Sequence, residues 1–308
     1  MSSLYENKDR NVRKTWLIFA IFLAVVIGIG WVFSRAYGNP AILYFAVIFS
    51  VVMNVTAYWH SDKLALRMAK ADPVKREDAR ELYNIVENLC ITAGLPVPKI
   101  YLMQEPVPNA FATGRNPEHA ALAVTSGLLE RLNRAELEGV IAHELSHIDN
   151  RDMLVSTMVI VLVGFISILS DLFMRSLWFT PSGVEGFGGS RRRSNNDSGG
   201  GLIMFLALAA MILAPIAAVL MQLAISRRRE FLADASGALL TRYPEGLASA
   251  LQKISQDPRP MRAATNTNAH LWFDDPFDGK QRKPWLYKLF MTHPPVEERI
   301  KALRGMEI

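Results

Sequence analysis

Four long apolar blocks limit the folds that this chain can adopt. They cover residues 15–33, 41–59, 153–173 and 202–225, and a continuous apolar run of about 20 residues is long enough to cross a bilayer as a helix. Half of the 308 residues are hydrophobic and the mean hydropathy is +0.14, which is more apolar than usual for a soluble protein of this size. We therefore expect an integral membrane protein with about four transmembrane helices.

Basic residues flank the apolar blocks and predict the topology. Lysines and arginines gather at residues 8–14 and again at 63–76, as they do on the cytoplasmic flanks of membrane spans. The two termini and the soluble segments are then expected in the cytoplasm, with loop 180–200 on the opposite side. Arg191 to Arg193 lie in this loop and argue against placing it outside the cytoplasm, because basic residues favour the cytoplasmic side. The formal charge of +5 does not predict a nucleic-acid partner, because no aromatic pattern is interleaved with the basic residues.

The blocks divide the chain into four segments. Residues 1–59 hold an N-terminal tail and a first transmembrane hairpin, and residues 153–225 hold a second hairpin around a flexible loop, 174–201. The soluble segments are residues 60–152 and residues 226–308. We expect one catalytic domain assembled from these two segments.

The first soluble segment has the pattern of a helix followed by a small sheet. Apolar residues recur at helical spacing from Ala79 to Cys90, and Gly94 is a typical helix end. Strands are expected in LPVPKIYLM, in Asn109 to Thr113 and in Ala120 to Thr125, with GRNPEH as the turn of a hairpin. Cys90 is the single cysteine, which excludes an intramolecular disulfide and a thiolate-rich zinc site.

The stretch GVIAHELSHIDNRD, residues 139–152, holds an H-E-x-x-H motif. Two histidines four residues apart on a helix, His143 and His147, face the same side and can bind one zinc ion. Glu144 between them is suited to act as the general base when water attacks an amide carbonyl. Asn133 and Glu136 form a typical N-terminal capping pair, which supports the helix. The motif predicts a peptidase with one Zn²⁺ per chain; the alternative is a buried helix with two hydrogen-bonded histidines.

The expected helix lies close to the third apolar block. If it continues into that block, His147 lies only about 10 Å along the helix axis from the first apolar residue. The metal would then sit at the membrane surface.

A catalytic zinc needs a third protein ligand. The residue six positions after the second histidine of the motif is a methionine, so the ligand must come from elsewhere. Glu230 and Asp234 are four residues apart on one expected helix face, and could supply a ligand and a carboxylate that orients a ligating imidazole. His270 and His293 are competing ligands, and His293 could instead stabilise an oxyanion. The chemistry of the residues leaves these alternatives open.

Five stretches together resemble one known family. They are NAFATG at 109–114, AVTSGLL at 123–129, HELSHIDNRD at 143–152, SRRREFLADASGA at 226–238 and THPPVEERI at 292–300. This set resembles the HtpX family of membrane-bound zinc metalloproteases, which is related more widely to the CAAX prenyl proteases. The resemblance spans almost the whole chain.

The resemblance implies a role for each of these site residues. It implies zinc ligation by His143, His147 and Glu230, with Glu144 as the base and Asp234 orienting a ligand. It also implies that His293 lies near the reacting carbonyl. Asn109 is implied on an edge strand that pairs with an extended substrate, a binding mode that tolerates many sequences.

The expected fold class is α+β and mainly helical, with a zincin-like (gluzincin) metalloprotease domain in an integral membrane protein. The expected function is a zinc endopeptidase of the cell (inner) membrane, with its site on the cytoplasmic side, that cleaves damaged or misassembled membrane proteins. The quality-control role comes from the resemblance. The expected partners of the protein are polypeptide substrates and the lipid bilayer. One alternative is a processing protease for a lipidated peptide, for which four spans are few to enclose a chamber. Another is a catalytically silent zinc scaffold, against which the presence of Glu144 argues.

Overall fold

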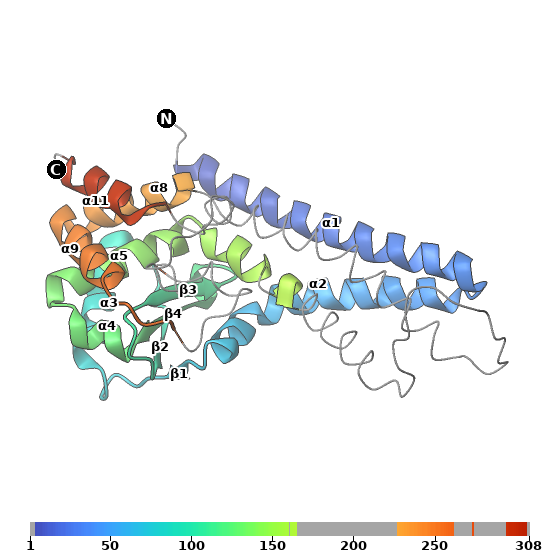
Figure 1. The fold of residues 1–308 in the computed structure, drawn as a ribbon, viewed down its shortest axis with the longest axis horizontal. Coiled ribbons are helices and arrows are strands. Elements are labelled where there is room, and N and C mark those ends of the chain that lie inside the picture. The colour runs from blue at the N-terminus through green and yellow to red at the C-terminus, as the bar shows by residue number, and fades with distance from the viewer. Residues whose placement is uncertain (1–3, 160, 165–226, 262–272, 274–293, 307–308) are drawn as a thin grey trace, which may run out of the picture.

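Two long apolar helices form a hairpin at the start of the chain. The computed structural model describes residues 4–159, 161–164, 227–261, 273 and 294–306, and within them α1 (Leu4–Tyr37) and α2 (Ala41–Met68) run side by side in opposite directions (Figure 1). By length and composition, Asn11–Arg35 and Ala41–Met68 could each span a membrane, with mean hydropathies of 2.7 and 1.9. The two spans predicted first along the chain are therefore present as helices. Residues 160 and 165–173 of the third block and all of the fourth lie outside the described residues.

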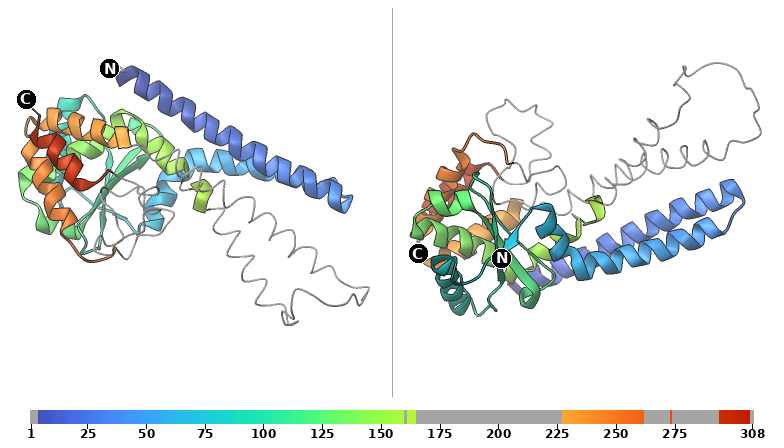
Figure 2. Two further views of the ribbon diagram at one scale, coloured as in Figure 1. Left: turned by 45° about the horizontal axis from the view of Figure 1, so that its top comes forward. Right: turned by 90° about the horizontal axis from the view of Figure 1, so that it is seen from below.

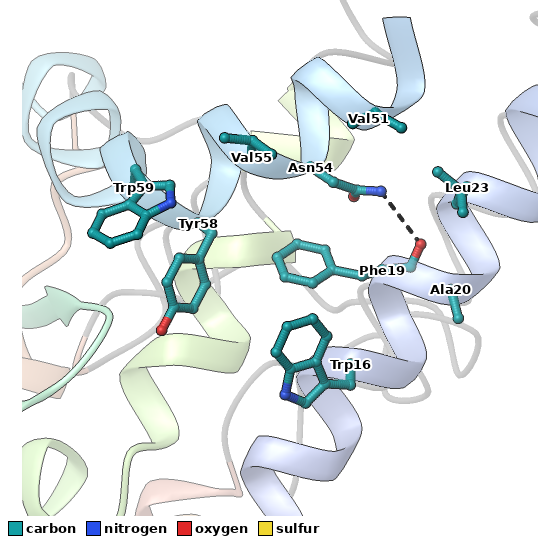
Figure 3. Close-up of a pocket in the computed structure, with 9 residues that line it drawn as sticks. All are labelled: Trp16, Phe19, Ala20, Leu23, Val51, Asn54, Val55, Tyr58 and Trp59. Atoms are coloured by element: carbon teal, nitrogen blue, oxygen red, sulfur yellow. Dashed lines mark hydrogen bonds between the residues drawn. The ribbon is translucent and has the colours of Figure 1, made fainter. Parts of the chain in front are cut away.

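Helices α1 and α2 approach closely near the turn that connects them. Farther from this turn they leave a groove between them. A Cβ atom on Gly30 would clash with Ala46, so a glycine is needed at this contact. The groove has a volume of about 580 Å³, and Figure 3 shows aromatic side chains from both helices along it. Asn54 on α2 donates a 3.5 Å hydrogen bond from Nδ2 to the carbonyl oxygen of Phe19 on α1. Tyr58 and Trp59 lie at the end of the second apolar block, where aromatic residues suit a membrane interface.

Helix α2 does not end with its apolar block. It continues from Trp59 to Met68, and its last turns pack against one face of the sheet, where Ala65 and Leu66 are buried together with Phe111 and Ala123. The membrane hairpin is thus joined to the sheet by a continuous helix.

Within the described residues, the sheet has four strands in the order β1-β2-β4-β3. Their bounds are Asp72–Pro73 for β1, Lys99–Met103 for β2, Ala110–Gly114 for β3 and Ala120–Thr125 for β4. Strand β2 pairs parallel with β4, whereas β1 pairs antiparallel with β2, and β3 pairs antiparallel with β4. The three predicted strands and the β3–β4 hairpin are confirmed, with the short helix η1 (Pro117–His119) in the turn. The two-residue strand β1 was not expected, because a Pro-containing dipeptide gives no period-2 pattern.

Side chains on the two faces of the sheet enter different cores. In β4, Leu122 and Val124 join the main core, whereas Ala121 and Ala123 face α2, as the period-2 geometry of a strand requires. Among the described residues, the labelled helices that contribute to the main core are α3 (Arg80–Ala93), α4 (Ser126–Arg131), α5 (Arg134–Asp149), α8 (Arg227–Thr241), α9 (Pro244–Ser255) and α11 (Val296–Arg304), and Met153 joins them. Figure 2 shows these helices gathered around the sheet, at one end of the α1–α2 hairpin.

Helix α3 confirms the expectations for its C-terminal end and for the cysteine. Gly94 caps it with a left-handed backbone, φ 68°, a conformation that glycine adopts without strain. Cys90 is 1% exposed in the main core, and burial raises the pKa of its thiol to about 11. The thiol is therefore a small apolar packing group.

The helix of the H-E-x-x-H motif is not continuous with the third apolar block. Helix α5 ends at Asp149, Arg151 has a positive φ of 56°, and helical residues begin again at Asp152. The 10 Å separation expected for one continuous helix therefore does not apply. Because of this change of direction, the carboxylate of Asp152 lies beside His147, with Oδ2 3.1 Å from Nδ1 of the imidazole.

Candidate metal centre

Helix α5 carries the H-E-x-x-H motif and begins with the predicted capping box. The Asn133 side chain accepts from the backbone N–H of Glu136 at 3.0 Å, and the Glu136 carboxylate accepts from the backbone N–H of Asn133 at 2.9 Å. The same carboxylate binds Ser249 and Lys253 of α9 at 2.6 and 2.7 Å. One side chain thus starts the helix and attaches it to its neighbour.

His143, His147 and Glu230 lie together in a geometry that suits a small cation. The two histidine Nε2 atoms are 3.1 Å apart, and the Glu230 carboxylate oxygens lie 3.8 Å from Nε2 of His143 and 3.7 Å from Nε2 of His147. Ligand atoms about 2.0–2.1 Å from a tetrahedral zinc ion are separated by about 3.3 Å. One ligand atom from each residue therefore fits around a single metal ion, and the three lie within 4.8 Å of one another.

Gly237 allows α8 to bring Glu230 to this position. A Cβ atom there would lie 2.9 Å from the backbone nitrogen of His143, closer than real Cβ contacts. The absence of a side chain lets the backbone of α8 lie directly against α5. Glu230 and Asp234, one turn apart on α8, then face the two histidines.

Asp234 and Arg299 hold the imidazole of His143. Its Nδ1 lies 2.9 Å from Asp234 Oδ1, and Arg299 on α11 donates to both oxygens of Asp234, at 2.7 and 2.8 Å. Burial lowers the pKa of His143 to about 4, although Asp234 acts in the opposite direction. Burial would raise the pKa of Asp234, but the neighbouring guanidinium lowers it to about 2. A neutral His143 that donates from Nδ1 leaves the Nε2 lone pair for a metal.

Asp152 serves His147 in the same way. His147 Nδ1 lies 3.1 Å from Asp152 Oδ2. Burial alone would lower the pKa of His147, but the hydrogen bond to Asp152 and the charges of Glu230, Asp152 and Glu144 raise it to about 9. A metal ion that binds Nε2 requires that nitrogen without its proton, so metal binding here is coupled to proton release. No role for Asp152 was predicted from the sequence, where the available signal is a carboxylate that closely follows the second histidine.

Arg299 is a second residue whose role at the site is not evident from the sequence. It is fully buried, with 0% exposure, and its guanidinium lies 5.0 Å from the ring centre of Phe273 as well as against Asp234. The motif THPPVEERI contains it, but an arginine near other charged residues has the pattern of an exposed helix face. Only its depth in the fold distinguishes it.

Removing Arg299 should destabilise the folded protein strongly. Arg299→Leu leaves the Asp234 carboxylate buried without its partner, and losing one member of a buried ion pair costs about 3 to 5 kcal/mol. Chemical denaturation of the metal-free protein in mild detergent measures the effect. Arg304→Leu, on the same helix, removes an ion pair with Glu245 in which both side chains are nearly half exposed, and should change stability little. Equal unfolding midpoints for both variants would contradict this role of Arg299.

The other predicted site residues have different positions. Glu144 is 3% exposed on α5 beside the two histidines. Asn109 immediately precedes β3, the last of the described strands on its side of the sheet, and its backbone N–H donates to Thr125 Oγ1 at 2.9 Å. On the same strand, the carbonyl oxygen of Ala110 accepts from the backbone N–H of Phe273 at 3.0 Å, and the Phe273 ring packs edge-on against His143. His270 and His293 lie outside the described residues.

Comparison with known proteins identifies the family of this chain. The model of peptidase family M48 matches residues 76–307. Proteins called "Protease HtpX homolog" are similar over nearly their whole length. That of Caldanaerobacter subterraneus subsp. tengcongensis is 47% identical, with 99% of each chain covered, and that of Pyrococcus furiosus is 45% identical, with 94% of each covered. The crystal structure of S. mikatae Ste24p has a similar fold, with a TM-score of 0.50 and 20% identity over 94% of this chain and 66% of that one. A family model that matches most of the sequence, together with full-length relatives at this identity, shows that the chain belongs to peptidase family M48.

Proposed function

We propose that this M48 metalloprotease is a zinc endopeptidase whose metal is held by His143, His147 and Glu230. The observation that carries the proposal is the convergence of two Nε2 atoms and one carboxylate within 4.8 Å. Each imidazole is held through Nδ1 by its own aspartate, at 2.9 and 3.1 Å, which directs both Nε2 lone pairs to the same point. Two histidines and one glutamate form a ligand set of catalytic zinc sites, which keep a fourth position open.

The residues around the metal position supply what amide hydrolysis requires. A bound zinc ion provides Lewis-acid activation of water and of the scissile carbonyl. Glu144 accepts a proton as the water oxygen bonds to the carbonyl carbon, and returns it to the amine nitrogen as the C–N bond breaks. The buried carboxylate of Glu144 lies close enough to His147 for its charge to contribute to the raised pKa of that histidine, which supports its place beside the proposed metal.

The substrate is proposed to bind as an added strand along β3, starting near Asn109. Among the described strands β3 is at the edge of the sheet, and the N–H of Phe273 bound to the Ala110 carbonyl indicates that its outward backbone groups are oriented for pairing; a substrate strand would occupy positions along β3 other than this carbonyl. Main-chain hydrogen bonds of this kind hold a peptide with little dependence on its sequence. His293 is proposed to stabilise the oxyanion.

The proposed natural substrates are damaged or misassembled membrane proteins. The support is the attachment of the catalytic body to a hairpin with two candidate spans, through a helix that enters the sheet core directly. The alternatives are processing of a lipidated peptide and a catalytically silent zinc scaffold. Turnover of unfolded polypeptides that carry no lipid would disfavour both.

A chelator experiment tests the proposed function. Purified protein in detergent should cleave an unfolded model protein, lose that activity when the zinc is removed by a chelator, and regain it when about one equivalent of Zn²⁺ is added. The physical reason is that the protein ligands alone provide no Lewis acid. Cleavage that persists in the fully metal-free protein would exclude a zinc mechanism. Binding of the unfolded protein without any cleavage would favour the scaffold.

We also propose a multi-pass topology with four spans and a cytoplasmic site. The segments are an N-terminal hairpin in residues 1–59, a second hairpin in 153–225, and one gluzincin-like domain built from 60–152 and 226–308. The basic flanks support this orientation. Reporter tags should place the N-terminus, the sheet and the C-terminus in the cytoplasm, with loop 180–200 opposite. A tag at Arg191 to Arg193 that reports the cytoplasm would contradict it, and would mean that the third and fourth blocks do not fully cross.

A further inference from the structure

Asp152 connects the candidate metal centre to the first membrane helix. One of its carboxylate oxygens, Oδ2, lies 3.1 Å from Nδ1 of the ligand His147. The other, Oδ1, accepts a 2.6 Å hydrogen bond from Nδ2 of Asn11 on α1 and lies 2.7 Å from Nε of Arg229 on α8. Figure 1 shows the start of α1 beside α8. Three helices therefore meet at one carboxylate.

Asn11 is fixed in this arrangement by more than one contact. Its Nδ2 also donates to the carbonyl oxygen of Asn150 at 2.9 Å, and its Oδ1 accepts from Arg229 at 3.4 Å. The side chain is 3% exposed, as is Asp152. A buried amide that lost these partners would bear the cost of desolvation without compensation. In the sequence, by contrast, Asn11 belongs to a polar segment whose ordinary role is to flank a membrane span.

The contacts of Asp152 determine how it can hold His147. A carboxylate that accepts from Nδ1 fixes the tautomer and the ring orientation of the imidazole, so that Nε2 is presented to the metal. The carboxylate itself can rotate unless its second oxygen is fixed. Asn11 and Arg229 fix that oxygen from two sides. His143 is held by Asp234, whose two oxygens accept from Arg299 of α11, so the contact from a membrane helix is a feature of the His147 side.

We propose that Asn11 is a positioning residue of the metal centre, which acts through Asp152 on His147 and makes the first membrane helix a part of the catalytic machinery. The inference rests on the proposed zinc site. The inference gives α1 a role beyond membrane anchoring. One of the two hydrogen-bond donors that fix Asp152 Oδ1 is Asn11 of α1, which lies outside both soluble segments.

The test measures zinc binding rather than proteolysis. The full-length chain is kept in detergent or nanodiscs, zinc affinity is obtained by competition with a chromogenic chelator, and the cobalt-substituted protein is followed by its visible absorption. Asn11→Ala should weaken zinc binding about tenfold, the lower end of the range for residues that hold a metal ligand in place. It should also shift the cobalt bands, because the ligand field depends on the orientation of the His147 ring.

Asn54→Ala is the matched control. Asn54 is also an asparagine of the membrane hairpin, and its Nδ2 bonds to the other helix at Phe19, but it does not contact Asp152. It should leave zinc affinity and the cobalt spectrum unchanged. A loss equal to that of Asn11→Ala would mean that any loosening of the hairpin weakens the site, and would overturn the inference.

A double-mutant cycle tests the route through Asp152. Asp152→Ala should weaken zinc binding by up to about 100-fold, and adding Asn11→Ala to it should change the affinity by less than about twofold, because residues that act through one another are not additive. A full tenfold loss in the Asp152→Ala background would overturn the proposed route. If Asn11→Ala does not accumulate in folded form, Asn11→Ser takes its place in the cycle and should show the same dependence on Asp152.

The outcomes separate this inference from the proposed function. Normal zinc binding by the unaltered protein, with affinity and cobalt bands unchanged in Asn11→Ala, would overturn the inference alone. An unaltered protein that binds no zinc would overturn the proposed function and this inference with it.

Discussion

Glu144→Gln should abolish peptide-bond cleavage while the zinc content stays near one ion per chain. The glutamine has the same shape but cannot accept the proton from the attacking water, and the loss of a general base slows such reactions by about 10² to 10⁴-fold. The metal should remain because its proposed ligands, His143, His147 and Glu230, are intact. Metal analysis and cleavage of an unfolded model protein, made on the same preparation, give both quantities.

The matched control for this variant is Glu138→Gln. Glu138 is on the same helix, where it forms a 2.9 Å ion pair with Arg134 and its side chain is 34% exposed. The control should cleave at close to the unaltered rate. Loss of zinc from the Glu144 variant would assign that residue to the metal instead, and undiminished turnover would exclude it as the base.

Glu230→Gln should lower the zinc affinity more than any other single carboxylate change at the site. The neutral amide oxygen is a poor ligand, and the two histidines alone leave the metal with too few protein ligands. Asp234→Asn should weaken binding by about 10 to 100-fold, the usual effect of losing a group that orients a ligand. The His293→Ala variant should retain its zinc but cleave peptide bonds more slowly, since the proposed role of His293 is to stabilise the oxyanion.

Zinc titration of the metal-free variants measures these affinities. Glu245→Gln is the control, because that carboxylate pairs with Arg304 at the surface, and it should bind zinc normally. Full zinc in the Glu230 variant together with an empty site in the His293 variant would mean that the two roles are exchanged.

The local features of this fold follow from short-range patterns in the sequence. Hydropathy over 25 and 28 residues defines the helices of the first hairpin. The i,i+4 spacing places His143 and His147 on one side of α5, and the capping box and the Gly94 helix end are each contained within a few residues. Such features are predictable because each depends on neighbours along the chain.

The assembly of the site depends on contacts that no local pattern encodes. The chemistry of the residues left three candidates for the third ligand, and the contact of Gly237 with α5 is what brings Glu230 close to both histidines. Asp234 meets Arg299 across 65 residues of sequence, and Asn11 meets Asp152 across 141. The reversal at Arg151, with φ 56°, turns Asp152 back to His147 where an uninterrupted helix would have carried it away.

The sequence by itself therefore determined the membrane character of this protein, its metal-binding helix and the type of chemistry. The tertiary structure decided which carboxylate orients each histidine, and that one of the residues holding these carboxylates belongs to the first membrane helix. The physical reason is one of range. Helical periodicity, capping and hydropathy act over a few turns of chain, whereas a buried hydrogen bond between distant segments exists only once packing has brought both groups out of water.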